Sequence, residues 1–190
     1  LSTIVNVIDL FINEKKISNE EKNNFLNILR LETTKMTSII NDLLDLTKIE
    51  TDLTKKIKKK ANFNKVINSS VRSMQTLAKK NGIKFKINVS KKATIFGDET
   101  QLQQLSKNIL DNSIKYANKN STVEISLKED SKNYKLIFSD KGRGIPHALI
   151  PRITERFYRT PEVKIKNIEG TGLGLAIVKH IAMRHQATLE

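Results

Sequence analysis

The chain has 190 residues, of which 38% are hydrophobic and 28% are charged, and its formal net charge is +14. This length allows one globular core plus an extended helical element, and the absence of cysteine excludes disulfides and thiolate metal sites. No apolar run approaches the roughly 20 residues that cross a bilayer, so we expect this piece to be soluble. The lysine run at residues 55–60 lacks aromatic side chains that could stack on bases, so we expect a solvated segment and no nucleic-acid partner.

Two helices are expected at the start of the chain. Over residues 1–12, apolar side chains recur every three or four positions, as on one stripe of a helix. Ser18 and Glu21 have the spacing of a capping box, which predicts that a long second helix begins there. The apolar residues of this helix follow a seven-residue pattern and are Phe25, Leu29, Met36, Ile39, Leu43 and Leu46, with Leu26 and Ile40 widening the stripe.

A helical hairpin of this kind has a wide apolar face that needs a partner. We predict that two chains pair into a dimeric four-helix bundle; the alternative is that the stripe docks on the following domain of the same chain. The apolar period stops and lysines gather after residue 51. This change places a linker at residues 55–61, between a helical domain at residues 1–54 and a second domain at residues 62–190.

The second domain is expected to mix helices and strands in an α+β layer arrangement. Helical periodicity predicts helices over residues 64–80, 99–117 and 173–184, the first of them ended by Gly82. Strands are expected over residues 83–89, 94–96, 123–127 and 134–139, with a hairpin between the last two. Residues 141–169 show no sustained period and are expected to form a long, mobile loop.

Three segments in order indicate a nucleotide site. The helix from residue 99 carries Asn108, Asn112, Lys115 and Tyr116 on neighbouring turns of one side, while Leu102, Leu105 and Ile109 are expected to face a core. Five of the seven glycines follow in two clusters, at residues 140–144 and 170–175, where the backbone can approach an anion. Taken alone, the helix favours an ordinary solvated face over a ligand site, and the first cluster fits a simple turn as well as it fits a binding loop. The combination favours a nucleotide, with amide oxygens for Mg²⁺ and backbone amides for phosphate.

These segments resemble the sensor histidine kinases of two-component systems. Residues 97–116 resemble the N box of that family, residues 140–144 and 170–175 its two glycine boxes, and residues 21–50 the second helix of its dimerisation and phosphotransfer domain. The resemblance implies a helical hairpin that forms a dimeric four-helix bundle, followed by an α+β sandwich of the histidine kinase, gyrase, Hsp90 and MutL type. Within the family, residues 150–159 and 174–180 are most similar to the phosphate-regulon sensor kinases.

The resemblance also implies roles for single residues. Asn112 would coordinate Mg²⁺, with Asn108 helping to organise the metal and the phosphates. Lys115 would contact phosphate, Tyr116 would cover the adenine, and Asp140 would hold the adenine amino group. The two glycine boxes add the other ATP-binding candidates: Gly142, Gly144, Ile145, Gly170, Thr171, Gly172, Leu173, Gly174 and Leu175.

Arg156 and Arg159 complete the catalytic candidates, with Asn108 and Lys115, because they would stabilise charge near the γ-phosphate. The alternative is a pair of solvated arginines beside a core residue, Phe157. Thr154 stands where many relatives have phenylalanine, which predicts a weaker aromatic latch in that segment.

The activity implied is autophosphorylation of a histidine from Mg-ATP, followed by transfer to an aspartate on the receiver domain of a response regulator. The family's acceptor motif is expected before Leu1, and the catalytic domain is expected to continue past Glu190. His147, His180 and His185 match no acceptor position and are expected at the surface.

The resemblance further implies the cytoplasmic part of a membrane-anchored bacterial sensor, which meets the membrane only through segments outside this sequence. Two other functions stay open. One is an ATP-driven conformational clamp of the same superfamily, in which a glutamate would stand where Asn108 stands. The other is a catalytically silent dimerisation module.

Overall fold

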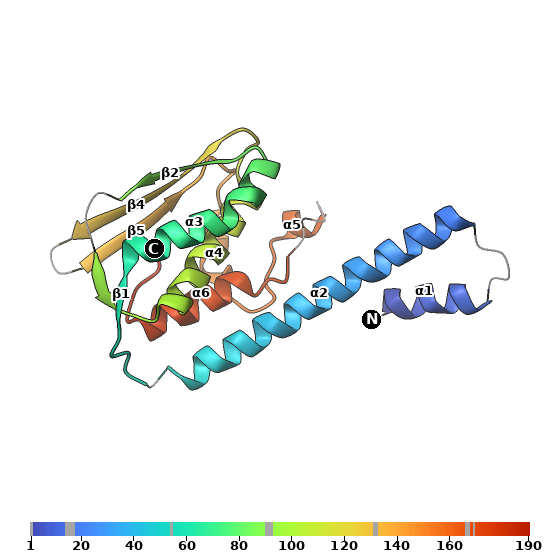
Figure 1. Cartoon of the computed structure of the whole chain (residues 1–190), viewed down its shortest axis with the longest axis horizontal. Helices are drawn as coiled ribbons and strands as arrows, with labels where there is room; N and C mark the ends of the chain where they lie inside the picture. The colour runs from blue at the N-terminus through green and yellow to red at the C-terminus, as the bar shows by residue number, and fades with distance from the viewer. Residues whose placement is uncertain are drawn as a thin grey trace. The chain divides into compact units, whose positions relative to one another are not determined.

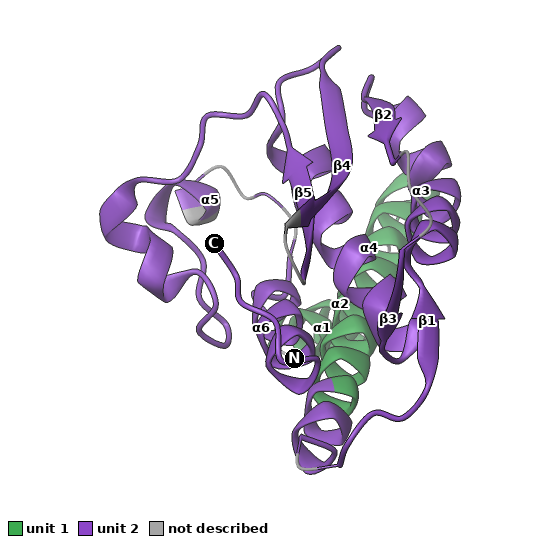
Figure 2. Ribbon diagram, turned by 90° about the vertical axis from the view of Figure 1, so that its left-hand side faces the viewer, with its two compact units in different colours: residues 1–45 green, residues 46–190 purple. Residues whose placement is uncertain are grey.

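The structure, a computed structural model, describes residues 2–13, 18–53, 55–89, 93–130, 133–165, 168 and 170–190 (Figure 1). It divides into two compact units, residues 1–45 and residues 46–190 (Figure 2). None of the described helices is long and apolar enough to span a membrane. Parts of three predicted features lie outside the described residues: Leu1 of the first helix, positions 131–132 of the hairpin, and positions 166–167 and 169 of the long loop.

The first unit is the predicted helical hairpin. It consists of α1 (Ser2–Asn13) and most of α2 (Asn19–Thr51). The capping box is confirmed, because the Ser18 hydroxyl accepts the Glu21 N–H at 3.2 Å and the Glu21 carboxylate accepts the Ser18 N–H at 2.9 Å. The Ser18 hydroxyl also donates to the Glu21 carboxylate at 2.7 Å, and this bond, together with the one from the Ser18 N–H, holds the pKa of Glu21 below its usual range. The rings of Phe11 and Phe25 meet edge to face at 5.6 Å between centroids, which joins the two helices.

The second unit is an α+β domain whose main sheet has the strand order β2-β4-β5. Strands β2 (Lys84–Asn88) and β4 (Thr122–Asp130) are parallel, whereas β4 and β5 (Asn133–Ser139) form the predicted antiparallel hairpin. Helices α3 (Phe63–Lys80) and α4 (Glu99–Tyr116) pack on one face of this sheet (Figure 1). The core between these layers is apolar and includes Ile67, Val71, Leu110, Ile114, Val123 and Ile125.

A second, two-stranded sheet was not predicted from the sequence. Strand β1 (Lys60–Asn62) pairs antiparallel with β3 (Thr94–Phe96), so that Ala61 lies opposite Ile95. The first two residues of β1 fall at the end of the expected linker. Ala61 is fully buried and packs in a small core with Phe63 and Leu102. Its burial was not predicted because it directly follows a run of lysines.

The expected long loop also contains structure. A 3₁₀ helix, η1 (His147–Arg152), and a short helix, α5 (Pro161–Ile165), form within it. The last helix, α6 (Gly174–Arg184), begins at the second glycine cluster and packs beside α4. The chain therefore brings the glycine cluster to the helix that carries the polar side chains.

Candidate functional site

Helix α4 carries the first part of the candidate site, and its start is fixed by a cap. The Asp98 carboxylate accepts the N–H groups of Thr100 and Gln101 at 3.0 and 3.1 Å. Asp98 is thus the N-cap that satisfies two donors that the helix itself cannot pair. The helix has a fixed beginning, which sets the direction in which its later side chains project.

The buried face of α4 differs from the one expected. Leu102 is buried as predicted, but Leu105 and Ile109 are only half-buried. The prediction for these two residues is wrong because small polar side chains take part of the buried stripe. The buried residues of α4 are Leu102, Ser106, Leu110, Ser113 and Ile114. Ser106 is tolerated there because its hydroxyl donates to the Leu102 carbonyl at 2.9 Å.

Asn108 lies against the second glycine cluster. A Cβ added at Gly174 would lie 3.8 Å from both Cγ and Oδ1 of Asn108. The Asn108 Nδ2 atom is buried and has no hydrogen-bond partner among the described residues. A buried amide without a partner is costly, so it marks a place where a ligand would supply the missing acceptor. Asn112, one turn later, is half-buried.

The first glycine cluster is joined to the end of α4. Ala117 and Gly142 form an isolated antiparallel bridge, and a Cβ at Gly142 would lie 2.7 Å from the Tyr116 carbonyl oxygen. Glycine is therefore required for this close approach. Asp140 follows β5 directly, and its Oδ1 accepts the Gly142 N–H at 2.8 Å. This bond fixes the orientation of the exposed Asp140 carboxylate.

Gly144 and Ile145 continue this cluster at the surface. Gly144 has φ +72°, a conformation that suits glycine, and a Cβ there would meet no atom within 4 Å. The Ile145 side chain is 48% exposed. Both residues therefore border open space, a few positions after Asp140.

The second glycine cluster is packed tightly at one position and open at another. Gly172 has φ +74°, and a Cβ there would lie 2.8 Å from the backbone carbon of Phe157. The Phe157 N–H donates to the Gly172 carbonyl at 2.9 Å. At Gly170 a Cβ would meet no atom within 4 Å. The Thr171 hydroxyl accepts the Leu173 N–H at 3.2 Å, and Leu173 is fully buried just before α6.

The cationic candidates all have partners within the chain. Lys115 forms an ion pair with Asp111 at 2.5 Å, Arg156 binds the Glu50 carboxylate, and Arg159 donates to the Ile168 carbonyl. Tyr116, the other side chain predicted at this end of α4, is half-buried.

The expectation that Phe157 is a core residue is wrong. The side chain is 54% exposed and the residue has φ +62°. Its backbone, and not its ring, is the part that packs against Gly172.

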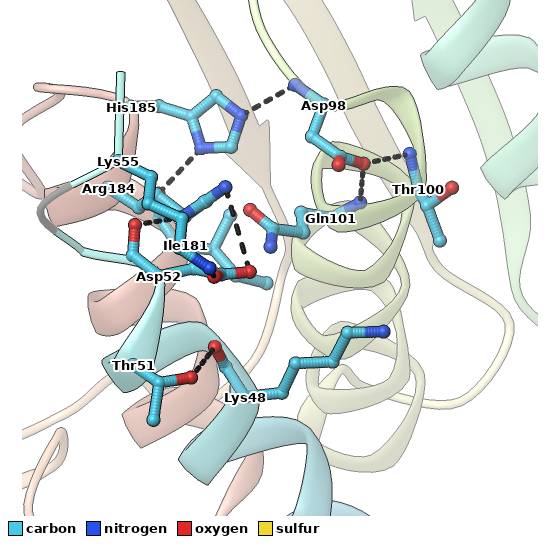
Figure 3. Close-up of polar contacts among 10 residues, drawn as sticks. All are labelled: Lys48, Thr51, Asp52, Lys55, Asp98, Thr100, Gln101, Ile181, Arg184 and His185. Atoms are coloured by element: carbon cyan, nitrogen blue, oxygen red, sulfur yellow. Dashed lines mark hydrogen bonds and ion pairs between the residues drawn. The ribbon is translucent and has the colours of Figure 1, made fainter. Parts of the chain in front are cut away.

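His185 was expected at the surface, and this expectation is wrong as well. Its Nε2 accepts the Asp98 N–H at 3.0 Å, and its Nδ1–H donates to the Ile181 carbonyl at 2.8 Å (Figure 3). The ring is therefore the neutral Nδ1–H tautomer, and burial lowers its pKa. Gly97 permits the approach, since a Cβ there would lie 3.3 Å from His185 Cδ2. The bond fastens the end of α6 to the cap of α4.

The other two histidines are arranged differently. His147 is exposed, as expected. His180 was also expected at the surface, and this expectation is wrong: its side chain is only 19% exposed, and its Nε2 lies 3.4 Å from Glu50 Oε1. Neither Glu50 nor His185 carries a sequence signal as a site residue, because each acts through a partner remote in the sequence.

The donors present fit a nucleotide held with a hard metal ion. Leu173, the N-cap of α6, gives no side-chain hydrogen bond to the helix, so first-turn N–H groups remain for an anion. Among the described residues no group of three or more His, Cys, Asp or Glu side chains could hold a metal. A cation here would therefore be bound by few protein atoms, such as the Asn112 amide oxygen, and by phosphate oxygens, as Mg²⁺ commonly is.

Comparison with known proteins agrees with this geometry. Residues 97–190 match the family model described as "Histidine kinase-, DNA gyrase B-, and HSP90-like ATPase". The phosphate regulon sensor protein PhoR of Pseudomonas aeruginosa is 32% identical over 156 residues, which cover 82% of this chain and 35% of PhoR. The chain thus spans about a third of the length of this relative.

Solved structures show the same fold. The mycobacterial sensor histidine kinase MprB matches with a TM-score of 0.58 and 28% identity, over 67% of this chain and 80% of that one. Full-length ShkA, solved in complex with AMPPNP, matches with a TM-score of 0.71 and 22% identity, over 96% of this chain and 38% of that one.

Proposed function

From the premise that this chain belongs to the two-component sensor histidine kinases and resembles PhoR, we propose that residues 62–190 bind Mg-ATP and deliver its γ-phosphoryl group to a histidine. The observation that carries this proposal is the closeness of Asn108 to Gly174, where an added Cβ would lie 3.8 Å from the Asn108 side chain, because it brings the N box to the start of α6. An orphaned amide and an uncapped helix start lie together there, and both are suited to phosphate.

The adenosine end of the nucleotide belongs to the first glycine cluster. The Asp140 carboxylate, oriented by the Gly142 N–H, accepts a hydrogen bond from the adenine amino group. The Tyr116 ring covers the base. Gly142 and Gly144 provide the turn, with Ile145 at its exposed edge. The close approach of Gly142 to the Tyr116 carbonyl keeps these two parts of the adenine site together.

The phosphate chain belongs to the second cluster. Backbone amides of residues 170–175 bind it, and Asn108 and Asn112 face it from α4. Mg²⁺, held by Asn112, supplies charge neutralisation at the phosphates when bound. Lys115, Arg156 and Arg159 stabilise the charge that spreads over the transferred group, so catalysis consists mainly of positioning and electrostatics.

The chemistry is one phosphoryl transfer followed by another. A ring nitrogen of the acceptor histidine bonds to the γ-phosphorus while the bond from that phosphorus to the β–γ bridging oxygen breaks, and ADP leaves. The neutral imidazole is the nucleophile. The phosphoryl group then passes to an aspartate on the receiver domain of a response regulator, and the likeness to PhoR supports a role in phosphate-starvation signalling.

We assign the remaining parts of the chain accordingly. Residues 1–54 form the dimerisation and phosphotransfer hairpin, residues 55–61 the linker, and the homodimer forms through the hairpin as a four-helix bundle. The acceptor histidine belongs to that bundle. The whole is the cytoplasmic kinase core of a membrane-anchored bacterial sensor.

Calorimetric titration with a non-hydrolysable ATP analogue tests the proposal. With Mg²⁺ present, we expect the chain to bind the analogue, and Asn112→Ala to weaken binding roughly 10- to 100-fold by removing a metal ligand. Asn118→Ala is the matched control, because Asn118 is an exposed asparagine just after α4. Absence of binding by the unaltered chain, or equal binding by Asn112→Ala, contradicts the assignment.

A further inference from the structure

Two side chains, those of Arg156 and His180, converge on the Glu50 carboxylate in the second unit. Glu50 lies in the last turn of α2 and its Oε1 accepts a hydrogen bond from Arg156 Nη2. His180 Nε2 of α6 lies 3.4 Å from the same oxygen. The Glu50 side chain is only 27% exposed, so its charge is partly removed from water and depends on these neighbours.

Arg156 is next to the phosphate-binding loop through its backbone. The following residue, Phe157, donates its N–H to Gly172 at 2.9 Å, and no Cβ fits between the two backbones. The Arg156 side chain thus starts beside the loop proposed for the phosphates, yet its guanidinium is bound to Glu50. A guanidinium group binds carboxylates and phosphates equally readily, so Arg156 could bind either the Glu50 carboxylate or the terminal phosphate of a nucleotide.

We propose that Glu50 is a positioning residue that competes with the γ-phosphate of ATP for the Arg156 guanidinium, so that the end of α2 sets how strongly the site distinguishes ATP from ADP. This inference rests on the proposed function. It adds to that function a residue outside the nucleotide-binding domain boundaries drawn from the sequence. Because Glu50 lies in the same helix as the hairpin, the competition would tie the nucleotide preference to that helix.

His180 does not replace Arg156 as the partner of Glu50 near neutral pH. Burial, together with the charges of Arg156 and Lys179, lowers the pKa of His180, and only Glu50 opposes this. The ring is therefore neutral, and Arg156 is the cation that balances Glu50. If Arg156 binds the γ-phosphate, the Glu50 carboxylate is left beside a neutral ring with no cation to balance it. The loss of this ion pair makes the net free energy of ATP binding less favourable.

A second ion pair of the same segment offers a matched control. Asp52 pairs with Lys55 at 2.7 Å and lies 3.9 Å from Arg184, which also donates to the Asp52 carbonyl (Figure 3). Arg184 is the last residue of α6, whereas Gly174 is its first, so this pair is at the far end from the phosphate loop. Asp52→Asn therefore removes a carboxylate from the same segment without freeing Arg156.

The test compares the affinities for a non-hydrolysable ATP analogue and for ADP, both with Mg²⁺, by calorimetry on the whole chain. We expect Glu50→Gln to raise affinity for the ATP analogue by roughly three- to tenfold and to leave that for ADP unchanged. Asp52→Asn should leave the ratio of the two affinities unchanged. Arg156→Gln should weaken binding of the ATP analogue, and Glu50→Gln should have no further effect when added to it.

The outcomes separate this inference from the proposed function. If both nucleotides bind but Glu50→Gln leaves their ratio unchanged, or its effect persists with Arg156→Gln, the competition is refuted and the nucleotide site stands. If Glu50→Gln changes the affinities for the ATP analogue and for ADP by the same factor, Glu50 has a purely structural role and the competition is refuted as well. If the unaltered chain binds neither nucleotide, the proposed function and this inference fail together.

Discussion

The two units of the chain differ in how far they bury their apolar side chains. Among the described residues of the first unit, 2–13 and 18–45, only Val7 is buried, while Leu26 and Ile40 are 49% and 54% exposed. The second unit buries Leu110, Val123 and Ile125 completely between its helices and sheet. Two helices cannot surround an apolar stripe, whereas helices on a sheet can. Seven-residue spacing therefore predicts a helix and the need for a partner, but not a core.

The largest effect is expected in the core of the second unit. Leu110→Ala should lower the free energy of unfolding of that unit by about 2–5 kcal/mol, because it leaves a cavity between α4 and the sheet. Leu31→Ala is the control in the first unit, where the side chain is 57% exposed, and should cost less than about 0.5 kcal/mol. Urea denaturation followed by circular dichroism measures both. Equal losses of unfolding free energy in the two variants would contradict the difference in side-chain burial between the units.

The exposed stripe of α2 should matter for association. Leu26→Asp combined with Ile40→Asp changes two residues that are two heptads apart, and each apolar side chain contributes about 1.5–3 kcal/mol if the dimer buries it. We expect sedimentation equilibrium to show a dimer for the unaltered chain and a monomer for this variant. Asn27→Asp adds charge at an exposed polar position of the same helix and should remain dimeric. A dimeric double variant would favour docking of the stripe elsewhere.

Within the second unit, two glycines of one cluster should differ. Gly172→Ala combines an unfavourable φ with a Cβ contact of 2.8 Å to the Phe157 backbone, and should destabilise the unit by about 1–3 kcal/mol. Gly170→Ala meets open space and should unfold like the unaltered chain. Thermal unfolding compares them. Similar midpoints for the two variants would show that the loop does not hold Gly172 against Phe157.

The smallest effect is a pH dependence from His185. Its folded pKa is below the ordinary 6.5, so the unfolded chain takes up the proton first. Its contribution is complete above about pH 6.5 and is lost as the pH falls toward the folded pKa, by at most about 1.4 kcal/mol per pH unit. Burial is the main cause of the lowered pKa and the charge of Arg184 adds to it, whereas the bond to the Ile181 carbonyl and the charge of Asp98 raise it.

Measurements of unfolding free energy between pH 7.5 and 5.5 check this sign, because protonated Nε2 cannot accept the Asp98 N–H. His185→Asn should flatten the curve and leave only the loss of the same sign expected from His180. Stability that rises on acidification in the unaltered chain would refute the assigned tautomer.

Local signals in the sequence predicted local structure well. Ser18 and Glu21 located the start of α2, and the alternation around Phe85 located β2, because capping and strand periodicity act within a few residues. Strand β1 escaped prediction, since three residues are too few to show a period, and its buried Ala61 follows a lysine run.

Contacts between remote residues escaped prediction for another reason. Glu50 and Arg156 are 106 positions apart, and His185 reaches Asp98 across 87 positions. Neither pair leaves a pattern in its own segment. The glycine clusters and the Asn108 helix were recognisable as parts of one site only through their order and their resemblance to a family.

Two-dimensional NMR of the labelled chain, titrated with Mg²⁺ and a non-hydrolysable ATP analogue, tests the nucleotide site most directly. We expect the NMR signals of the backbone amides of residues 170–175 and of the side-chain amides of Asn108 and Asn112 to shift together in proportion to bound analogue, while the amide signals of α1 stay unchanged. Unchanged signals at these positions, with or without shifts elsewhere, would contradict a nucleotide site between α4 and the second glycine cluster.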